Sequence, residues 1–192
     1  MIVNKVDLKG TEYKILKKFN KKIFSFSELL NDMRSNEYSR LENYYKDKFE
    51  FIKFKDEEVI IENDKKEEFI VFGRNSNGLF VINKNGEVWL IPFYISDIEK
   101  PIFINSSLYK FRCCYCLLLS ILFFFLGQDV NQEECLKIAK KYKMDIFRID
   151  SYSVNSLFYK NYIFSIENAE LPIHFTPMDY VNNGRHFIPQ YK

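Results

Sequence analysis

The fold class is decided by residues 68–91, which read EFIVFGRNSNGLFVINKNGEVWLI. Short apolar runs separated by segments with glycine and asparagine are typical of strands joined by turns. We expect a first strand over residues 68–72, ending at Gly73, a second over 79–83 and a third over 87–91. The Asn-Gly pair before the third strand fits a type I′ turn, which needs positive φ at both central positions. The stretch therefore predicts an antiparallel meander.

Upstream of this meander the sequence predicts helices first and then strands. The segment TEYKILKKF at residues 11–19 predicts a helix, and Ser25 or Ser27 can cap a second one. Alternation in FEFIKF and the apolar run in EVIIE predict strands between residues 49 and 62. Residues 1–49 are expected to form an N-terminal helical region, and whether it belongs to the domain stays open.

Downstream of the meander we expect three helices and an irregular tail. An apolar helix follows the potential caps at residues 105–107 and ends at Gly127. A second helix opens with NQEE at residues 131–134, and an amphipathic segment covers residues 155–167. The proline-punctuated residues 169–192 are expected to be irregular. The predicted class is α+β, a single domain with an antiparallel or mixed sheet packed against helices.

The amino-acid composition limits the classes of protein to which this chain can belong. The chain has 192 residues, typical of one domain and long enough to bury a core without disulfides or a structural metal. Hydrophobic residues make up 47% and charged residues 28%, which excludes wholesale disorder. Aromatic residues reach 18%, but the lysine-rich, alanine-poor composition indicates A/T-rich codons rather than stacking platforms for nucleic acid.

The charge balance gives no clear polyanion signal. The formal net charge is +2, which is too small to imply nucleic acid by itself. Residues 1–22 hold seven lysines and two acidic residues, a segment that could contact phosphate or a membrane. A solvated charged surface is the preferred interpretation. We expect no direct nucleic-acid partner and no membrane partner.

The longest uncharged run is CCYCLLLSILFFFL at residues 113–126. Fourteen helical residues span about 21 Å, less than the roughly 30 Å of a hydrocarbon core. This run is therefore interpreted as a buried helix. Charges at Lys5, Asp7 and Lys9 interrupt the N-terminal segment that a signal peptide would need, so a cytoplasmic location is expected.

Cys113 and Cys116 have the C-x-x-C spacing of a zinc or redox pair. Zinc would need two more ligands from Cys135, His174 and His186, none of which has a second paired spacing. Thiols inside an apolar helix behave as small hydrophobic groups, so core packing is preferred. No metal and no cofactor are expected; a thiol or metal protein stays an alternative, which bound zinc would support.

Catalytic motifs are not apparent in the sequence. It contains neither the G-x-x-x-x-G-K-[ST] phosphate loop nor the G-x-S-x-G nucleophile elbow. Acid pairs such as Glu57-Glu58 lie in a charged run typical of solvated surface, and Asp150 is expected to cap the start of a helix. The chain is therefore expected not to be an enzyme.

The order of these features resembles the SUKH superfamily, and most closely its type-four immunity-protein branch. The matching elements are the strand ending in Gly73, the hairpin strand with Trp89, and FINSSLYKF at residues 103–111. That branch carries a V-x-hydrophobic-Gly strand, a Gly-x-Val hairpin and an F-x-N-S-S-L-x-x-F helix start in this order. The resemblance covers roughly residues 50–168, which would form the SUKH-like domain.

The sequence match to this branch is weaker at the closing helix. FRIDSYSVNSLFYKNYIFSIE at residues 147–167 is similar to the branch's I-D-P…W…I-E segment. Ser151 stands where proline is usual, and Phe158 or Tyr162 where tryptophan is usual.

The resemblance implies a non-enzymatic binding module. Many members are encoded beside a polymorphic bacterial toxin and neutralise it by direct binding, and the fold does not name the toxin. The alternative is a SUKH-like regulatory or scaffolding module without a toxin partner. The candidate partner-binding residues flank the sheet loops and are Arg74, Asn75, Asn77, Tyr94 and Asp97. The oligomeric state stays open.

Overall fold

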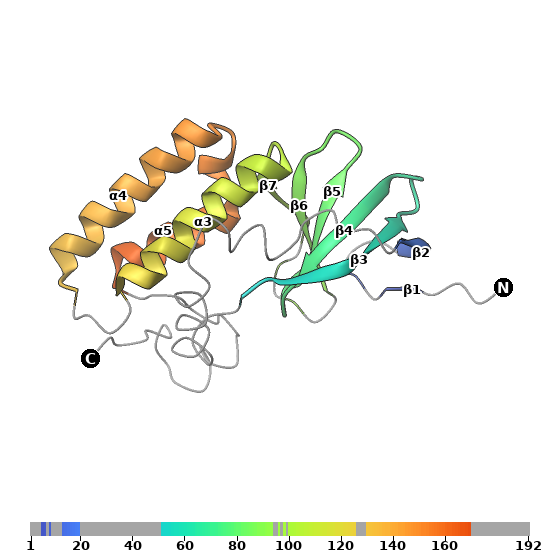
Figure 1. The fold of residues 1–192 in the computed structure, drawn as a ribbon, viewed down its shortest axis with the longest axis horizontal. Coiled ribbons are helices and arrows are strands. Elements are labelled where there is room, and N and C mark those ends of the chain that lie inside the picture. Colours follow the sequence, from blue (N-terminus) through green and yellow to red (C-terminus); the bar gives the residue numbers. More distant parts are fainter. Residues whose placement is uncertain are drawn as a thin grey trace. The chain divides into compact units, whose positions relative to one another are not determined.

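The computed structural model describes residues 5–6, 8, 13–19, 51–93, 96, 98, 100–125 and 130–169. The α+β class is confirmed by a seven-stranded antiparallel sheet and three α-helices in this part of the chain (Figure 1). The chain divides into two compact units, one holding the sheet as far as Phe111 and the other holding the helices from Arg112 onward. The predicted packing of the sheet against the helices stays a prediction.

The strands follow one another across the sheet in sequence order. Every neighbouring pair is antiparallel, so the predicted meander is confirmed and extended at both ends. The strands are β1 (Lys5–Val6), β2 (Tyr13–Phe19), β3 (Lys53–Glu62), β4 (Glu68–Arg74), β5 (Gly78–Asn83), β6 (Val88–Pro92) and β7 (Ile102–Asn105).

The helix predicted over residues 11–19 is wrong, because this segment forms β2 and pairs with β3. The pairing register shifts between Ile15 and Lys17, so Leu16 is an extra residue and its side chain is 46% exposed. A bulge of this kind inserts one residue into the period-two pattern of a strand. Apolar residues then recur three apart around Leu16, which imitates helical spacing. The helix predicted from Ser25 or Ser27 lies outside the described residues.

The turn between β5 and β6 is present where it was predicted, but its predicted type is wrong. Asn83 N–H donates to the Glu87 carbonyl at 3.0 Å, and Gly86 N–H donates to the Asn83 carbonyl at 2.9 Å. Positive φ occurs at Gly86, with a value of 80°, but not at Asn85. Three residues separate the hydrogen-bonded pair, and a loop of this length uses a type I turn followed by one left-handed residue.

The turn between β3 and β4 repeats this geometry with a different residue at the critical position. Asn63 N–H donates to the Glu67 carbonyl at 3.1 Å, and Lys66 N–H donates to the Asn63 carbonyl at 3.0 Å. Lys66 takes the left-handed conformation with φ 64°. The two turns read NDKKE and NKNGE, so both begin with asparagine and end with glutamate.

The asparagine side chains hold both turns in the same way. Asn63 Oδ1 accepts from the N–H groups of Lys65 and Glu67, and its Nδ2 donates to the Glu67 carboxylate at 2.8 Å. Asn83 makes the corresponding bonds to residues 85 and 87. Both turns therefore fix their own geometry with local side-chain hydrogen bonds.

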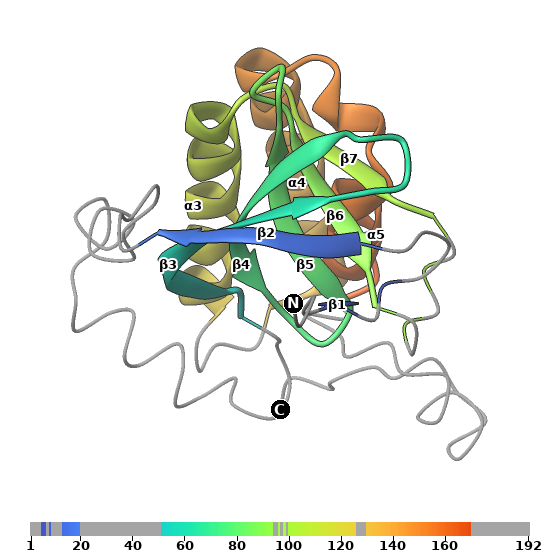
Figure 2. The ribbon, with the colours of Figure 1, turned by 90° about the vertical axis from the view of Figure 1, so that its right-hand side faces the viewer.

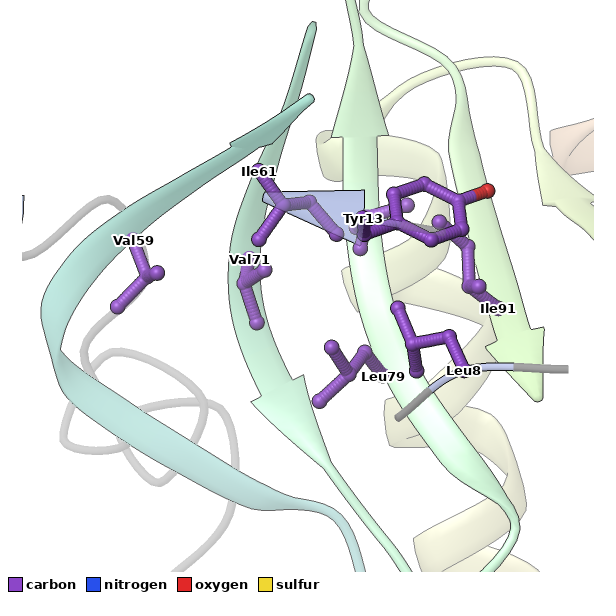
Figure 3. Close-up of a cluster of buried hydrophobic side chains, with 8 residues drawn as sticks. Leu8, Tyr13, Val59, Ile61, Val71, Leu79 and Ile91 are labelled. Carbon is purple, nitrogen blue, oxygen red and sulfur yellow. The ribbon is translucent and has the colours of Figure 1, made fainter. Parts of the chain in front are cut away.

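The sheet curls so that its first strands meet its later ones. Leu8, just after β1, forms an antiparallel β-bridge with Phe93, just after β6 (Figure 2). Leu8 and Tyr13 lie on the same side of the sheet as Val71, Leu79 and Ile91 in Figure 3. The buried cluster on this side comprises Leu8, Tyr13, Val59, Ile61, Val71, Leu79, Val81 and Ile91.

The opposite side of the sheet carries an aromatic cluster. Phe72 directly follows Val71, and Phe80 directly precedes Val81, both of which belong to the first cluster. Because successive residues of a strand point to opposite faces, the Phe72 and Phe80 side chains point to the other face. Phe111 packs on both, with ring centroids 5.5 Å from Phe72 and 6.2 Å from Phe80. Both faces of the sheet thus carry buried apolar side chains.

The helices are α3 (Leu108–Phe125), α4 (Gln132–Ile149) and α5 (Leu157–Glu167), with a 3₁₀ turn at Ser153–Asn155. The predicted opening of the second helix is confirmed, because Asn131 and Glu134 form a reciprocal capping box. Ser156 caps α5. Asp150 closes α4 instead of opening a helix, and its carboxylate accepts from the Ser153 hydroxyl at 2.7 Å.

One helix among the described residues, α3, is long and apolar enough to cross a membrane by length and composition. It spans 18 residues, because it includes the charged first turns as well as the uncharged run. Core helices of soluble proteins pass the same test. Seven of its side chains, which follow the i, i+3, i+4 pattern of one helix face, are at most 2% exposed: Phe111, Cys114, Tyr115, Leu118, Leu119, Leu122 and Phe125.

Candidate functional site

The turn between β4 and β5 brings three of the candidate binding residues together. Asn75 N–H donates to the Gly78 carbonyl at 3.1 Å. The Asn75 side-chain oxygen accepts from the N–H groups of Asn77 at 3.1 Å and Gly78 at 3.2 Å. An asparagine used in this way fixes the turn from within. The Asn75 side-chain oxygen therefore has a structural role here.

A second set of contacts fastens this turn to the end of β6. The Asn77 carbonyl accepts from Phe93 N–H at 2.9 Å, and Gly78 pairs with Pro92. Phe93 is also the residue that bridges to Leu8. The turn, the end of β6 and the segment after β1 therefore meet at one end of the sheet.

The candidate residues differ in what they present to solvent. Arg74, the last residue of β4, is exposed, whereas Asn75 and Asn77 are half-buried. Tyr94 and Asp97 lie outside the described residues. The charged group exposed at this turn is the Arg74 guanidinium, a group that can form paired hydrogen bonds with a carboxylate.

The four cysteines are free thiols with different surroundings. Cys114 and Cys135 are buried, and Cys113 and Cys116 are half-buried on α3. Burial, with a smaller contribution from the Glu134 carboxylate, raises the pKa of the Cys135 thiol and so reduces its thiolate fraction. Within the described ranges no three His, Cys, Asp or Glu side chains gather as metal ligands, and both histidines lie outside those ranges.

A buried tyrosine cluster in the helical unit was not singled out from the sequence. The Tyr142 and Tyr159 rings lie 6.4 Å apart, and the Tyr142 hydroxyl donates to the Cys114 carbonyl at 3.4 Å. Burial, and then the neighbouring Cys114, raise the pKa of both phenols well above the ordinary value of 10.0. Both rings stay neutral near pH 7, which fits them to packing rather than proton transfer.

The outer side of α4 is a second feature that the sequence analysis missed. Leu136, Met144 and Phe147 are apolar but stand 49%, 47% and 59% exposed. They fall outside the buried stripe of the helix, which the structure shows to comprise Cys135, Ala139, Tyr142 and Ile146.

Comparison with known proteins gives no match: no family model matches the sequence, and no curated protein or solved structure is similar to it.

Proposed function

We propose that this chain is an immunity protein that binds a toxin encoded beside it and blocks the toxin's active site. The proposal starts from the SUKH resemblance of the sequence. The observation that carries it is that the most specific part of that resemblance, residues 103–111, occupies a well-defined junction between β7 and α3.

Five residues of this junction have a clear structural role. Asn105 is fully buried at the end of β7. The Ser107 hydroxyl accepts from Lys110 N–H at 3.3 Å, as a helix cap does. The Lys110 ammonium group donates to the Ser106 hydroxyl at 2.8 Å, and Phe111 anchors the first turn of the helix to the aromatic cluster. A pattern this closely tied to packing supports kinship in fold, which is the basis of the functional proposal.

The mechanism is occlusion by a preformed surface. The turn after β4 is fixed by its own asparagine and by the end of β6, so its ordering adds little to the entropic cost of association. Arg74 projects from this turn and provides charge complementarity, which favours fast association and selects the partner.

Co-expression with the product of the neighbouring gene tests this proposal. The neighbouring product alone is expected to stop growth, and co-expression with this chain is expected to restore growth and to yield a stoichiometric complex on purification. A neighbouring product that is harmless alone and does not co-purify would contradict the proposal. Growth restored without a complex would also contradict the occlusion mechanism, because it would indicate chemistry performed by this chain.

A further inference from the structure

Helix α4 carries a stripe of mixed apolar and basic character on its outer side. Successive helical residues are rotated by about 100°, so positions 136, 140, 143, 144 and 147 fall within a sector of about 100°. We call these residues the α4 stripe: Leu136, Lys140, Lys143, Met144 and Phe147. All five are exposed, and the stripe is separate in sequence from the turn after β4.

The charges beside the α4 stripe neutralise one another. Lys137 pairs with Glu133 at 2.6 Å, while Lys141 and Arg148 both pair with Asp145, at 2.5 and 3.5 Å. Glu133 falls within the sector of the stripe and is neutralised by Lys137, and the other residues of these ion pairs occupy the neighbouring sector of the helix.

The two lysines within the stripe differ from these. Lys140 and Lys143 form no ion pair with any residue in the described part of the chain. The stripe thus presents three half-exposed apolar side chains together with two cations that no carboxylate of the described chain neutralises.

This combination specifies the chemistry of a partner. Exposed Leu, Met and Phe side chains in one sector gain free energy when an apolar surface covers them. Two unneutralised ammonium groups among them favour a surface whose apolar centre is flanked by carboxylates, because opposite charges steer the encounter and suppress other partners. Phenylalanine and methionine are also enriched at protein interfaces.

We propose that the α4 stripe is a contact surface for the toxin, and that it binds an acidic surface with an apolar centre. This inference rests on the proposed immunity function and adds a second part of the chain, with its partner chemistry, to the turn after β4. Phe147 supplies the apolar anchor, and Lys140 and Lys143 supply the charge.

The experiment uses the full chain and the purified neighbouring-gene product, with the dissociation constant measured at two salt concentrations. Phe147→Ser is expected to raise the dissociation constant at least tenfold. Lys140→Glu/Lys143→Glu is expected to raise it at least tenfold at low salt, with a smaller effect at high salt. The matched control is Lys65→Glu/Lys84→Glu, which makes the same charge change on exposed lysines of the sheet hairpins and should alter it less than twofold.

The outcomes separate the two proposals. If the wild-type chain binds and the stripe variants bind equally well, the stripe is not the contact surface and the immunity function stands. If the wild-type chain does not bind, both proposals fail. Two further assays use the same variants: binding to phosphatidylserine vesicles, and sedimentation to detect self-association. If the stripe substitutions change vesicle binding or self-association but leave toxin binding unchanged, the inference is overturned. Thermal unfolding of each variant verifies that these exposed substitutions leave the fold intact.

Discussion

The two asparagine turns differ at one position where backbone conformation decides the preferred residue. Lys66 and Gly86 occupy equivalent places in their turns, with φ values of 64° and 80°. A side chain with a Cβ atom is strained in this left-handed region, whereas glycine adopts it freely. A Cβ added at Gly86 would meet no atom within 4 Å, so the contrast between the two turns lies in the backbone.

Replacing Lys66 by glycine is therefore expected to stabilise the protein. Removing the left-handed strain stabilises the folded state by more than the extra flexibility of glycine stabilises the unfolded chain. We therefore expect a gain of about 0.5–1 kcal/mol in the free energy of unfolding. The substitution also removes the 3.0 Å ion pair between Lys66 and Glu62, but the lysine side chain is 73% exposed and such pairs contribute little. Urea unfolding of the variant and the wild type measures the difference.

Lys66→Ala is the matched control for this prediction. It removes the same ion pair and keeps the Cβ atom in the left-handed conformation, so it should not stabilise the protein. Equal stability of the glycine and alanine variants would show that strain at Lys66 does not matter.

The buried tyrosines predict a loss of stability at high pH. Tyr142 and Tyr159 have pKa values raised well above 10.0, while tyrosine in the unfolded chain titrates near 10. Above about pH 10 the unfolded state loses these protons before the folded state does, so the free energy of unfolding falls as pH rises. Below that pH neither state releases them and this contribution is constant.

Denaturant unfolding between pH 9 and 11 measures the effect. Tyr142→Phe/Tyr159→Phe should show a shallower fall in stability with pH than the wild type, whatever its stability at pH 7. Tyr109→Phe, at a side chain that is 72% exposed, serves as the control and should retain the wild-type slope. A double variant with the wild-type slope would contradict the assignment.

Among the elements, β5 and β6 depend on a close approach that glycine alone permits. A Cβ atom at Gly78 would lie 2.2 Å from the Ile91 carbonyl oxygen, which is backbone and cannot move without breaking the pairing of the two strands. Gly78→Ala is expected to cost about 3 kcal/mol by overpacking.

Gly73→Ala provides the comparison within the neighbouring strand. Its nearest obstacle is the Ile52 Cγ2 atom at 2.9 Å, a side-chain group that can shift, so we expect a cost of about 1 kcal/mol. Thermal unfolding of both variants is the measurement. Similar losses of stability at the two positions would show that β5 and β6 can move apart more easily than the structure indicates.

The elements that the sequence predicted well are those with strictly local signals. Strands β4, β5 and β6 are short apolar runs with turn residues between them, and α4 has a capping box. The prediction failed at β2 because a bulge at Leu16 breaks the period-two pattern, and the choice between strand and helix then depends on pairing with distant β3. The type of the β5–β6 turn was missed because the loop has three residues rather than two.

For the whole molecule, the features that the sequence could not predict depend on contacts between distant residues. The Leu8–Phe93 bridge joins segments 85 positions apart and leaves no local pattern. At the candidate site, the grouping of Arg74, Asn75 and Asn77 followed from their positions in one turn, whereas the hydrogen bond from Phe93 to Asn77 did not. The exposure of Phe147 could not be predicted from the sequence, because it depends on which side of α4 is buried.

The most direct test of the proposed function is the stoichiometry and affinity of the complex between this chain and the product of its neighbouring gene, measured with both purified proteins. We predict a tight complex of fixed stoichiometry that abolishes the toxin's activity in vitro, with binding and inhibition saturating at the same ratio. Absence of binding at micromolar concentrations, with the neighbouring product still toxic to cells that also express this chain, would contradict it.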